Sequence, residues 1–128
     1  MCQQIVPHMK AQRWGRIINI GSEVFSDGTP NFSAYVAAKG GQVGLCRSLA
    51  SELAPFGITV NTIAPGWIPV ERHEGITDAL KETYRQTIPM GHFGVPDDVA
   101  NAVVFLAGEA AGFITAAHIH VNGGRTVQ

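Results

Sequence analysis

Tyr35 and Lys39 lie four residues apart in the segment Tyr-Val-Ala-Ala-Lys, and Ser22 precedes the tyrosine by thirteen positions. Four residues make about one turn of helix, so a helix here would place the phenol and the ammonium on one face. A neighbouring cation favours the phenolate form, which makes a tyrosine a usable proton donor or acceptor near neutral pH. A serine hydroxyl at a strand end can reach a substrate oxygen. The three residue types fit reduction of a carbonyl or oxidation of an alcohol.

Each of these residues also has an ordinary interpretation. A helical tyrosine–lysine pair is usually a solvated helix face, and Ser22 could be a simple strand-end hydroxyl. The surrounding elements favour the chemical interpretation. Three short apolar or β-branched runs, at residues 16–21, 58–64 and 117–122, are predicted as strands. Helical patterns separate them, which predicts an α/β fold with parallel strands and right-handed crossovers.

The helix that carries Tyr35 has predicted boundaries. Asn31 or Ser33 can cap its start, and Pro55 and Gly57 mark its end. Three glycines, at positions 40, 41 and 44, lie inside it. Each costs about 1 kcal/mol relative to alanine, so we expect a strand or a second helix to pack closely against them.

Other segments have weaker helical signals. Residues 3–13 show helical periodicity, although Pro7 would disturb a helix interior. Pro96 suits a first helical position, with two aspartates after it at the positive helix end. Residues at helical spacing around Leu80 predict one more helix. The segments 23–33 and 65–74 are predicted as loops.

In this order the elements resemble the C-terminal half of a short-chain dehydrogenase/reductase, over essentially all 128 residues. The later motifs that add to the resemblance are Pro65-Gly66, Gly-Val-Pro-Asp-Asp-Val-Ala at 94–100, Phe-Leu-Ala at 105–107 and Val-Asn-Gly-Gly at 121–124. The chain is most similar to the β-ketoacyl-carrier-protein reductase and the sugar or polyol dehydrogenase branch. The resemblance implies one partial Rossmann-like domain over residues 1–128: about three strands of a doubly wound parallel sheet with flanking helices.

The resemblance also implies catalytic roles. In this family a nicotinamide ring delivers hydride to a carbonyl carbon while a tyrosine protonates the oxygen. Tyr35 would be that acid/base. Lys39 would stabilise its phenolate and bind the nicotinamide ribose, and Ser22 would hydrogen-bond the substrate oxygen.

Cofactor contacts follow from the same resemblance. Besides Tyr35 and Lys39, backbone groups around Pro65, Gly66 and Ile68 would contact the carboxamide of NAD or NADP.

One position departs from the family pattern. A threonine is common four positions after Gly66, and Val70 stands there instead, which removes one hydroxyl contact to the cofactor. Trp67, Val70 and His73 would belong to a segment that covers the substrate.

The usual pyrophosphate-binding device is a glycine-rich turn between a first strand and its helix. No such turn occurs among the 128 residues, so we expect the N-terminal cofactor half to be absent and the chain alone to be inactive. An unpaired strand edge would then remain, which predicts a homo-oligomer or a complementing N-terminal half. Two interpretations stay open: the catalytic half of an oxidoreductase, or a non-catalytic truncated paralogue acting as an oligomerising or regulatory subunit.

Composition narrows the class of protein. Hydrophobic residues make up 45% and charged residues 15%, with a net charge of −1, which is typical of a globular domain without a nucleic-acid footprint. No apolar run approaches a membrane span, and the N-terminus lacks a secretory pattern. The two cysteines lack metal-type spacing, and a cytoplasmic location is predicted.

His118 and His120 would face one side of a strand, but without a third ligand we assign them to a structural or interface role and predict no metal.

Overall fold

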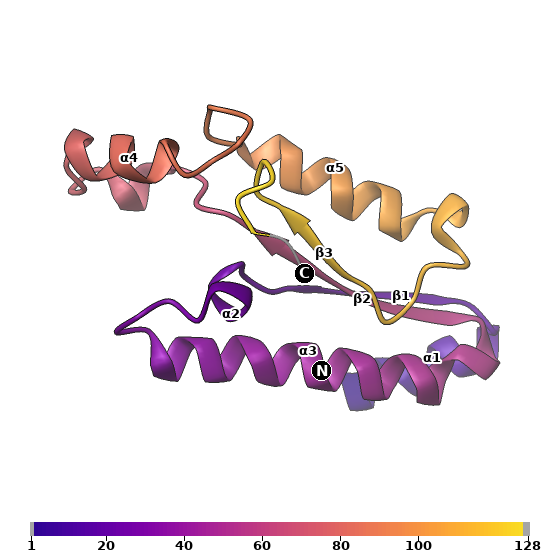
Figure 1. Ribbon diagram of the computed structural model, residues 1–128. Helices are drawn as coiled ribbons and strands as arrows, with labels where there is room; N and C mark the ends of the chain where they lie inside the picture. The colour runs from indigo at the N-terminus through magenta and orange to yellow at the C-terminus, as the bar shows by residue number, and fades with distance from the viewer. Residues whose placement is uncertain (1, 127–128) are drawn as a thin grey trace.

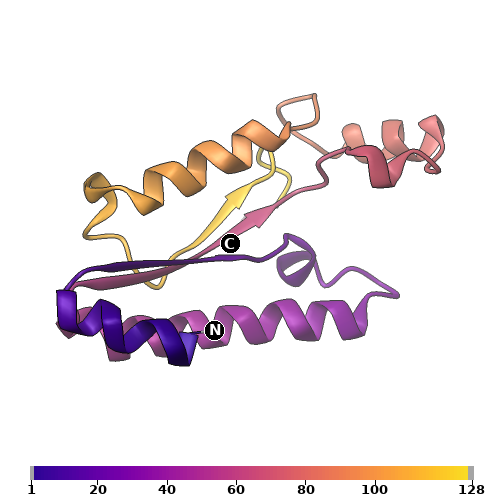
Figure 2. The ribbon, with the colours of Figure 1, turned by 180° about the vertical axis from the view of Figure 1, so that it is seen from behind.

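The structure, a computed structural model, describes residues 2–126 and has an α/β fold. Three parallel strands form one sheet in the order β1-β2-β3, namely Gly15–Ile20, Ile58–Pro65 and His118–Val121. Helix α3 (Ser33–Leu53) runs under one face, with α1 (Cys2–Gln12) beside it, and α5 (Pro96–Ala107) crosses the other face (Figures 1 and 2). The predicted fold class is confirmed, and each strand lies within one or two residues of its predicted bounds.

The central strand β2 holds the sheet together. Its residues from Ile58 to Ala64 are all buried, whereas β3 is partly buried and β1 is partly buried between Gly15 and its exposed last residue, Ile20. A short β-branched run suits this position because both of its faces are covered. Among the described residues β1 pairs only with β2, so its outer edge is unpaired.

Two apolar clusters, one on each face, join the helices to the sheet. On the α3 face the buried members are Cys46, Ala50, Leu53, Ile58 and Val60. On the α5 face they are Ile63, Leu106 and Ala111. Alternate residues of β2 therefore serve opposite layers, as the two-residue period of a strand requires.

The helix boundaries agree with the sequence in some places and not in others. Helix α3 ends at Leu53 and a 3-10 turn leads to Gly57, whose φ of 71° only glycine adopts readily. The predicted caps are wrong: Phe32 occupies the cap position without a side-chain bond, and Asn31 has a left-handed φ of 65°. Pro7 lies in the interior of α1, contrary to the expectation from its chemistry.

The prediction for the α3 glycines is correct at one position only. A Cβ on Gly40 would approach the Phe25 ring to 2.8 Å, so this glycine allows close packing of α2 (Val24–Asp27). Gly41 and Gly44 face open space, and the expectation of close packing there is wrong.

Two predicted loops contain short helical turns. Helix α2 lies within residues 23–33, and the 3-10 turn η2 (Glu71–His73) lies within residues 65–74. Helix α4 (Asp78–Arg85) follows and projects beyond the end of the sheet (Figure 1). None of the helices in the described range has the length and apolar character needed to cross a bilayer.

Candidate active site

The carboxyl ends of the three strands meet at one edge of the molecule. The Gly21 amide donates to the Ile63 carbonyl at 2.7 Å, directly before Ser22. The Glu23 amide donates to the Pro65 carbonyl at 3.1 Å, and the Gly66 amide donates to the Val121 carbonyl at 3.0 Å. Open α/β sheets bind ligands at this edge. The fold therefore brings the predicted serine and the Pro-Gly segment to the same end of the sheet.

Helix α3 brings Tyr35 and Lys39 to that edge. The Lys39 Nζ lies 5.5 Å from the centroid of the Tyr35 ring, so the two side chains share a helix face as predicted. The same Nζ donates to the Ile20 carbonyl at 2.9 Å, at the last residue of β1. Tyr35 remains 45% exposed. The ammonium therefore connects the phenol to the strand end that leads into Ser22.

Ser22 is turned toward the start of α2. Its Oγ accepts from the Val24 amide at 3.4 Å, and within residues 2–126 no hydrogen bond joins it to the Tyr35 phenol. The structure brings Lys39 and Tyr35 into contact and places Ser22 two residues beyond the carbonyl that Lys39 binds. The serine thus belongs to the same strand end, with its hydroxyl bonded to the start of α2.

Three backbone groups of Pro65-Gly66-Trp67 are bonded within the chain. The Pro65 carbonyl and the Gly66 amide bridge the strand ends, and the Trp67 amide donates to the Tyr84 hydroxyl at 2.7 Å. A Cβ on Gly66 would lie 2.9 Å from the Cβ of Asn122, so the position requires glycine. No hydrogen bond within the described part of the chain uses the Ile68 backbone. Among the predicted carboxamide contacts, the Gly66 carbonyl and the Ile68 backbone take part in no hydrogen bond between described residues.

The predicted substrate-covering segment forms a compact aromatic group. The Nδ1 atom of His73 accepts from the Trp67 indole at 3.2 Å and from the Val70 amide at 3.3 Å. The Trp67 ring packs edge-on against Tyr84 and Phe93, whose rings stack with centroids 5.7 Å apart. These contacts tie the segment after β2 to α4 and to the stretch before α5.

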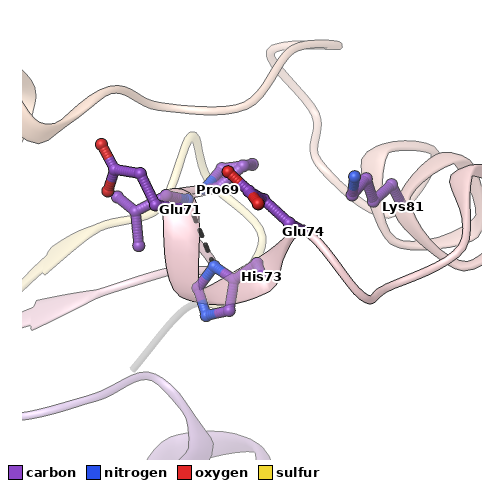
Figure 3. A pocket seen from close by; sticks show the side chains of 6 residues that line it. Pro69, Glu71, His73, Glu74 and Lys81 are labelled. Atoms are coloured by element: carbon purple, nitrogen blue, oxygen red, sulfur yellow. Dashed lines mark hydrogen bonds between the residues drawn. The ribbon is translucent and has the colours of Figure 1, made fainter.

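A hollow of about 260 Å³ opens beside this segment. Its lining combines apolar surface with charged side chains, and Lys81 approaches from α4 (Figure 3). The residues that line it are Pro69, Val70, Glu71, His73, Glu74 and Lys81. Its walls therefore carry groups of both charges.

Sequence reasoning missed a buried carboxylate next to the serine. Glu23 is only 3% exposed. Its oxygens accept from Asn122 Nδ2 at 3.0 Å, from an Arg125 guanidinium nitrogen at 2.9 Å and from the hydroxyls of Tyr84 and Thr126. The partners lie 61 to 103 residues away in sequence, so no local pattern signals them.

His118 and His120 lie on one side of β3, as predicted. Their ring centroids are 4.9 Å apart, and His120 Nε2 is 2.9 Å from the Ser26 hydroxyl. Burial, with the charges of His120 and Arg47, lowers the pKa of His118. Across residues 2–126 no three His, Cys, Asp or Glu side chains gather as a metal site would need.

Comparison with known proteins agrees with this geometry. A family model described as enoyl-(acyl carrier protein) reductase matches residues 1–126. The chain is 50% identical over 116 residues to the 3-oxoacyl-(acyl-carrier-protein) reductase FabG of Haemophilus influenzae. It belongs to the short-chain dehydrogenase/reductase family.

Further relatives fall in the same ketoacyl reductase branch. The chain is 45% identical over 122 residues to the FabG reductase of Rickettsia felis. A crystal structure of 3-oxoacyl-(acyl-carrier protein) reductase from Brucella melitensis superposes with a TM-score of 0.91 at 30% identity, over 96% of this chain and 46% of that one. The Haemophilus and Rickettsia matches cover 91% and 95% of this chain but 48% and 51% of the relatives. The chain thus spans about half the length of the curated relatives it matches.

Proposed function

We propose that this chain carries the proton-transfer site of an NAD(P)-dependent oxidoreductase that interconverts a ketone and a secondary alcohol. A 3-oxoacyl thioester is the first candidate substrate, because the relatives at 44–50% identity are named as 3-oxoacyl-carrier-protein reductases. The observation that carries the proposal is the double contact of Lys39, whose ammonium lies beside the Tyr35 ring and on the Ile20 carbonyl.

The residues present fit the nicotinamide end of the cofactor. An ammonium and an exposed phenol stand at the carboxyl edge of the parallel strands, which suits ribose hydroxyls. The Ile68 backbone keeps hydrogen-bonding capacity for a carboxamide. When bound, the nicotinamide would supply hydride to the carbonyl carbon.

The chain's own residues would handle the proton. Tyr35 would donate its phenolic proton to the developing alkoxide, and the Lys39 ammonium would stabilise the phenolate that remains. Ser22 would orient the substrate oxygen by donating a hydrogen bond to it, because accepting from the Val24 amide leaves the Ser22 O–H available as a donor. In the reverse direction the same phenolate would accept the alcohol proton.

The test is a chimera that joins this chain to the part of the Haemophilus influenzae reductase outside the matched region. We expect it to oxidise NADH or NADPH in the presence of an acetoacetyl thioester. Tyr35→Phe should lower kcat by about 10²–10⁴, the usual contribution of a general acid, while cofactor affinity is retained. Turnover that survives Tyr35→Phe contradicts the assigned role.

A matched lysine pair checks the cation. Lys39→Met should lower both cofactor affinity and kcat in the chimera. Lys10→Met should change neither, because Lys10 stacks on Phe56 near the starts of the strands. Equal effects of the two changes would argue for a general loss of charge instead of a site-specific role.

A second candidate is a non-catalytic assembly subunit. The unpaired edge of β1 and the exposed side chains of Val104, Phe105 and Phe113 favour it. Turnover by the chimera would contradict this candidate, and titration of the isolated chain with NADH and NADPH, followed by cofactor fluorescence, tests whether the chain binds cofactor alone. Tight binding supports a complete cofactor site in this chain, and no binding is expected from a chain that lacks a glycine-rich phosphate turn.

A further inference from the structure

The buried carboxylate of Glu23 has no place in the chemistry above, although it directly follows Ser22. Removing a charged group from water costs several kcal/mol unless its partners are well placed. Glu23 is almost fully buried and has partners on both of its oxygens. We therefore expect the buried Glu23 carboxylate to hold other segments of the chain in a defined position.

Three segments meet at Glu23, two of them on its carboxylate and one on its backbone amide. The C-terminal segment contributes Asn122, Arg125 and the Thr126 hydroxyl. Helix α4 contributes the Tyr84 hydroxyl. The Glu23 amide itself is bound to the Pro65 carbonyl at the end of β2. One side chain therefore connects the serine strand end, the substrate-covering segment and the residues after β3.

Tyr84 carries this connection to the predicted substrate-covering segment. Its hydroxyl donates to Glu23 and accepts from the Trp67 amide at 2.7 Å. Burial and the Glu23 carboxylate raise the pKa of the phenol, so it remains a donor across the working pH range. Arg125 lies over the Tyr84 ring at 4.7 Å and also pairs with Asp27.

We propose that Glu23 is a positioning residue that holds residues 67–93, which comprise the predicted substrate-covering residues Trp67, Val70 and His73 together with α4, against the strand end carrying Ser22. The path runs from the Trp67 amide through the Tyr84 hydroxyl to the Glu23 carboxylate, one residue from the serine. This inference extends the proposed function and depends on it only for the catalytic role of Ser22. The mechanical link itself can be measured without substrate or cofactor.

The chain offers a clean local probe. Its two tryptophans are Trp14 and Trp67, so in a Trp14→Phe background Trp67 is the one remaining indole and reports on residues 67–93. Its two tyrosines are Tyr35 and Tyr84, which makes Tyr35→Phe a matched removal of a phenolic hydroxyl elsewhere. Lys81 and Arg85, both in α4, provide trypsin sites within the segment.

In that background, Tyr84→Phe and Glu23→Gln should each increase acrylamide quenching of Trp67 and accelerate trypsin cleavage in α4. The expected acceleration is about tenfold, the factor for losing one hydrogen bond that closes the segment. Tyr35→Phe should alter neither readout. A purely structural ion pair would lower the urea midpoint of Glu23→Gln while leaving native-state quenching of Trp67 unchanged, and that result overturns the proposal.

A double variant tests whether the two residues act through one bond. If they do, Glu23→Gln with Tyr84→Phe should be cleaved about as fast as the faster single variant. Independent effects would multiply, which contradicts the proposed path. Should Glu23→Gln fail to fold, the comparison of Tyr84→Phe with Tyr35→Phe still decides the matter.

The catalytic arm uses the chimera described above. Glu23→Gln should raise KM for the acyl substrate several-fold while the Kd for NADPH is retained. Loss of the Trp67 link together with an unchanged KM would overturn the positioning role. An inactive chimera, by contrast, would count against the proposed function. The quenching and cleavage results would still test the link from Trp67 through Tyr84 to Glu23.

Discussion

The side chain of Lys39 contacts both the Tyr35 ring and the strand end that leads into Ser22. Its ammonium lies 5.5 Å from the Tyr35 ring centroid and 2.9 Å from the Ile20 carbonyl. The first contact was predictable, because a four-residue spacing on a helix always places two side chains on one face. The second was not, because it depends on how α3 packs across the sheet.

The burial of Glu23 and its partners could not be predicted from the residues around it. A lone glutamate in a stretch of small and polar residues indicates a solvated loop. Its burial depends on Tyr84, Asn122 and Arg125, which the fold brings from 61 to 102 positions away. A pattern search over neighbouring residues has no access to such a network.

His118 predicts a pH dependence of stability. Burial, then the nearby His120 and Arg47, lowers its folded-state pKa below the ordinary 6.5. As pH falls through 6.5 the unfolded chain binds the proton first, so the free energy of unfolding decreases until the folded-state pKa is passed. His118→Gln should reduce this slope between about pH 7 and pH 5 in urea unfolding.

Arg47→Gln supplies a graded check on that explanation. Removing the guanidinium takes away a lesser cause of the shift, so the slope should decrease less than in His118→Gln. An identical slope in the parent chain and in His118→Gln would show that another group governs the titration.

At the scale of elements, the strands were easier to predict than the turns. Continuous β-branched runs indicate buried parallel strands because both faces must be apolar. Helix α2 escaped prediction because Ser26, Asp27 and Gly28 favour a loop, whereas Phe25 packs onto the gap that Gly40 leaves in α3. Tertiary packing decided the local conformation there.

The ends of β2 and β3 approach each other closely at the site. A Cβ on Gly66 would lie 2.9 Å from the Asn122 Cβ and 3.1 Å from the Tyr84 hydroxyl. Gly66→Ala should therefore lower the free energy of unfolding by about 1–3 kcal/mol through overpacking. Gly41→Ala, in open space on α3, should raise it by about 0.5–1 kcal/mol.

Urea unfolding of the two glycine variants measures both signs in one experiment. The opposite directions separate steric crowding from a general effect of replacing glycine. A neutral Gly66→Ala would mean that Asn122 can move away, and with it the residues that bind Glu23.

At the scale of the whole molecule, the outer edge of β1 remains unpaired within the described residues. The Gly21 amide donates to the Ile63 carbonyl in β2, so the amide and carbonyl of the preceding residue, Ile20, point to the opposite side, away from β2. An exposed row of such groups is a template for another strand. The chain spans about half of its relatives, so we expect the edge to accept a parallel strand from the remaining half.

Ile20→Pro tests that expectation with little harm to the existing sheet. Proline removes the outward amide of an edge strand while the β1–β2 bonds, made by the neighbouring residues, stay in place. The parent chain, mixed with the unmatched part of the Haemophilus influenzae reductase as a separate polypeptide, should elute as a complex in size-exclusion chromatography. Ile20→Pro should lose the complex and Ile20→Val, which keeps the amide, should retain it. Equal binding by both variants would place the docking surface elsewhere, with the exposed α5 side chains Val104 and Phe105 as the next surface to change.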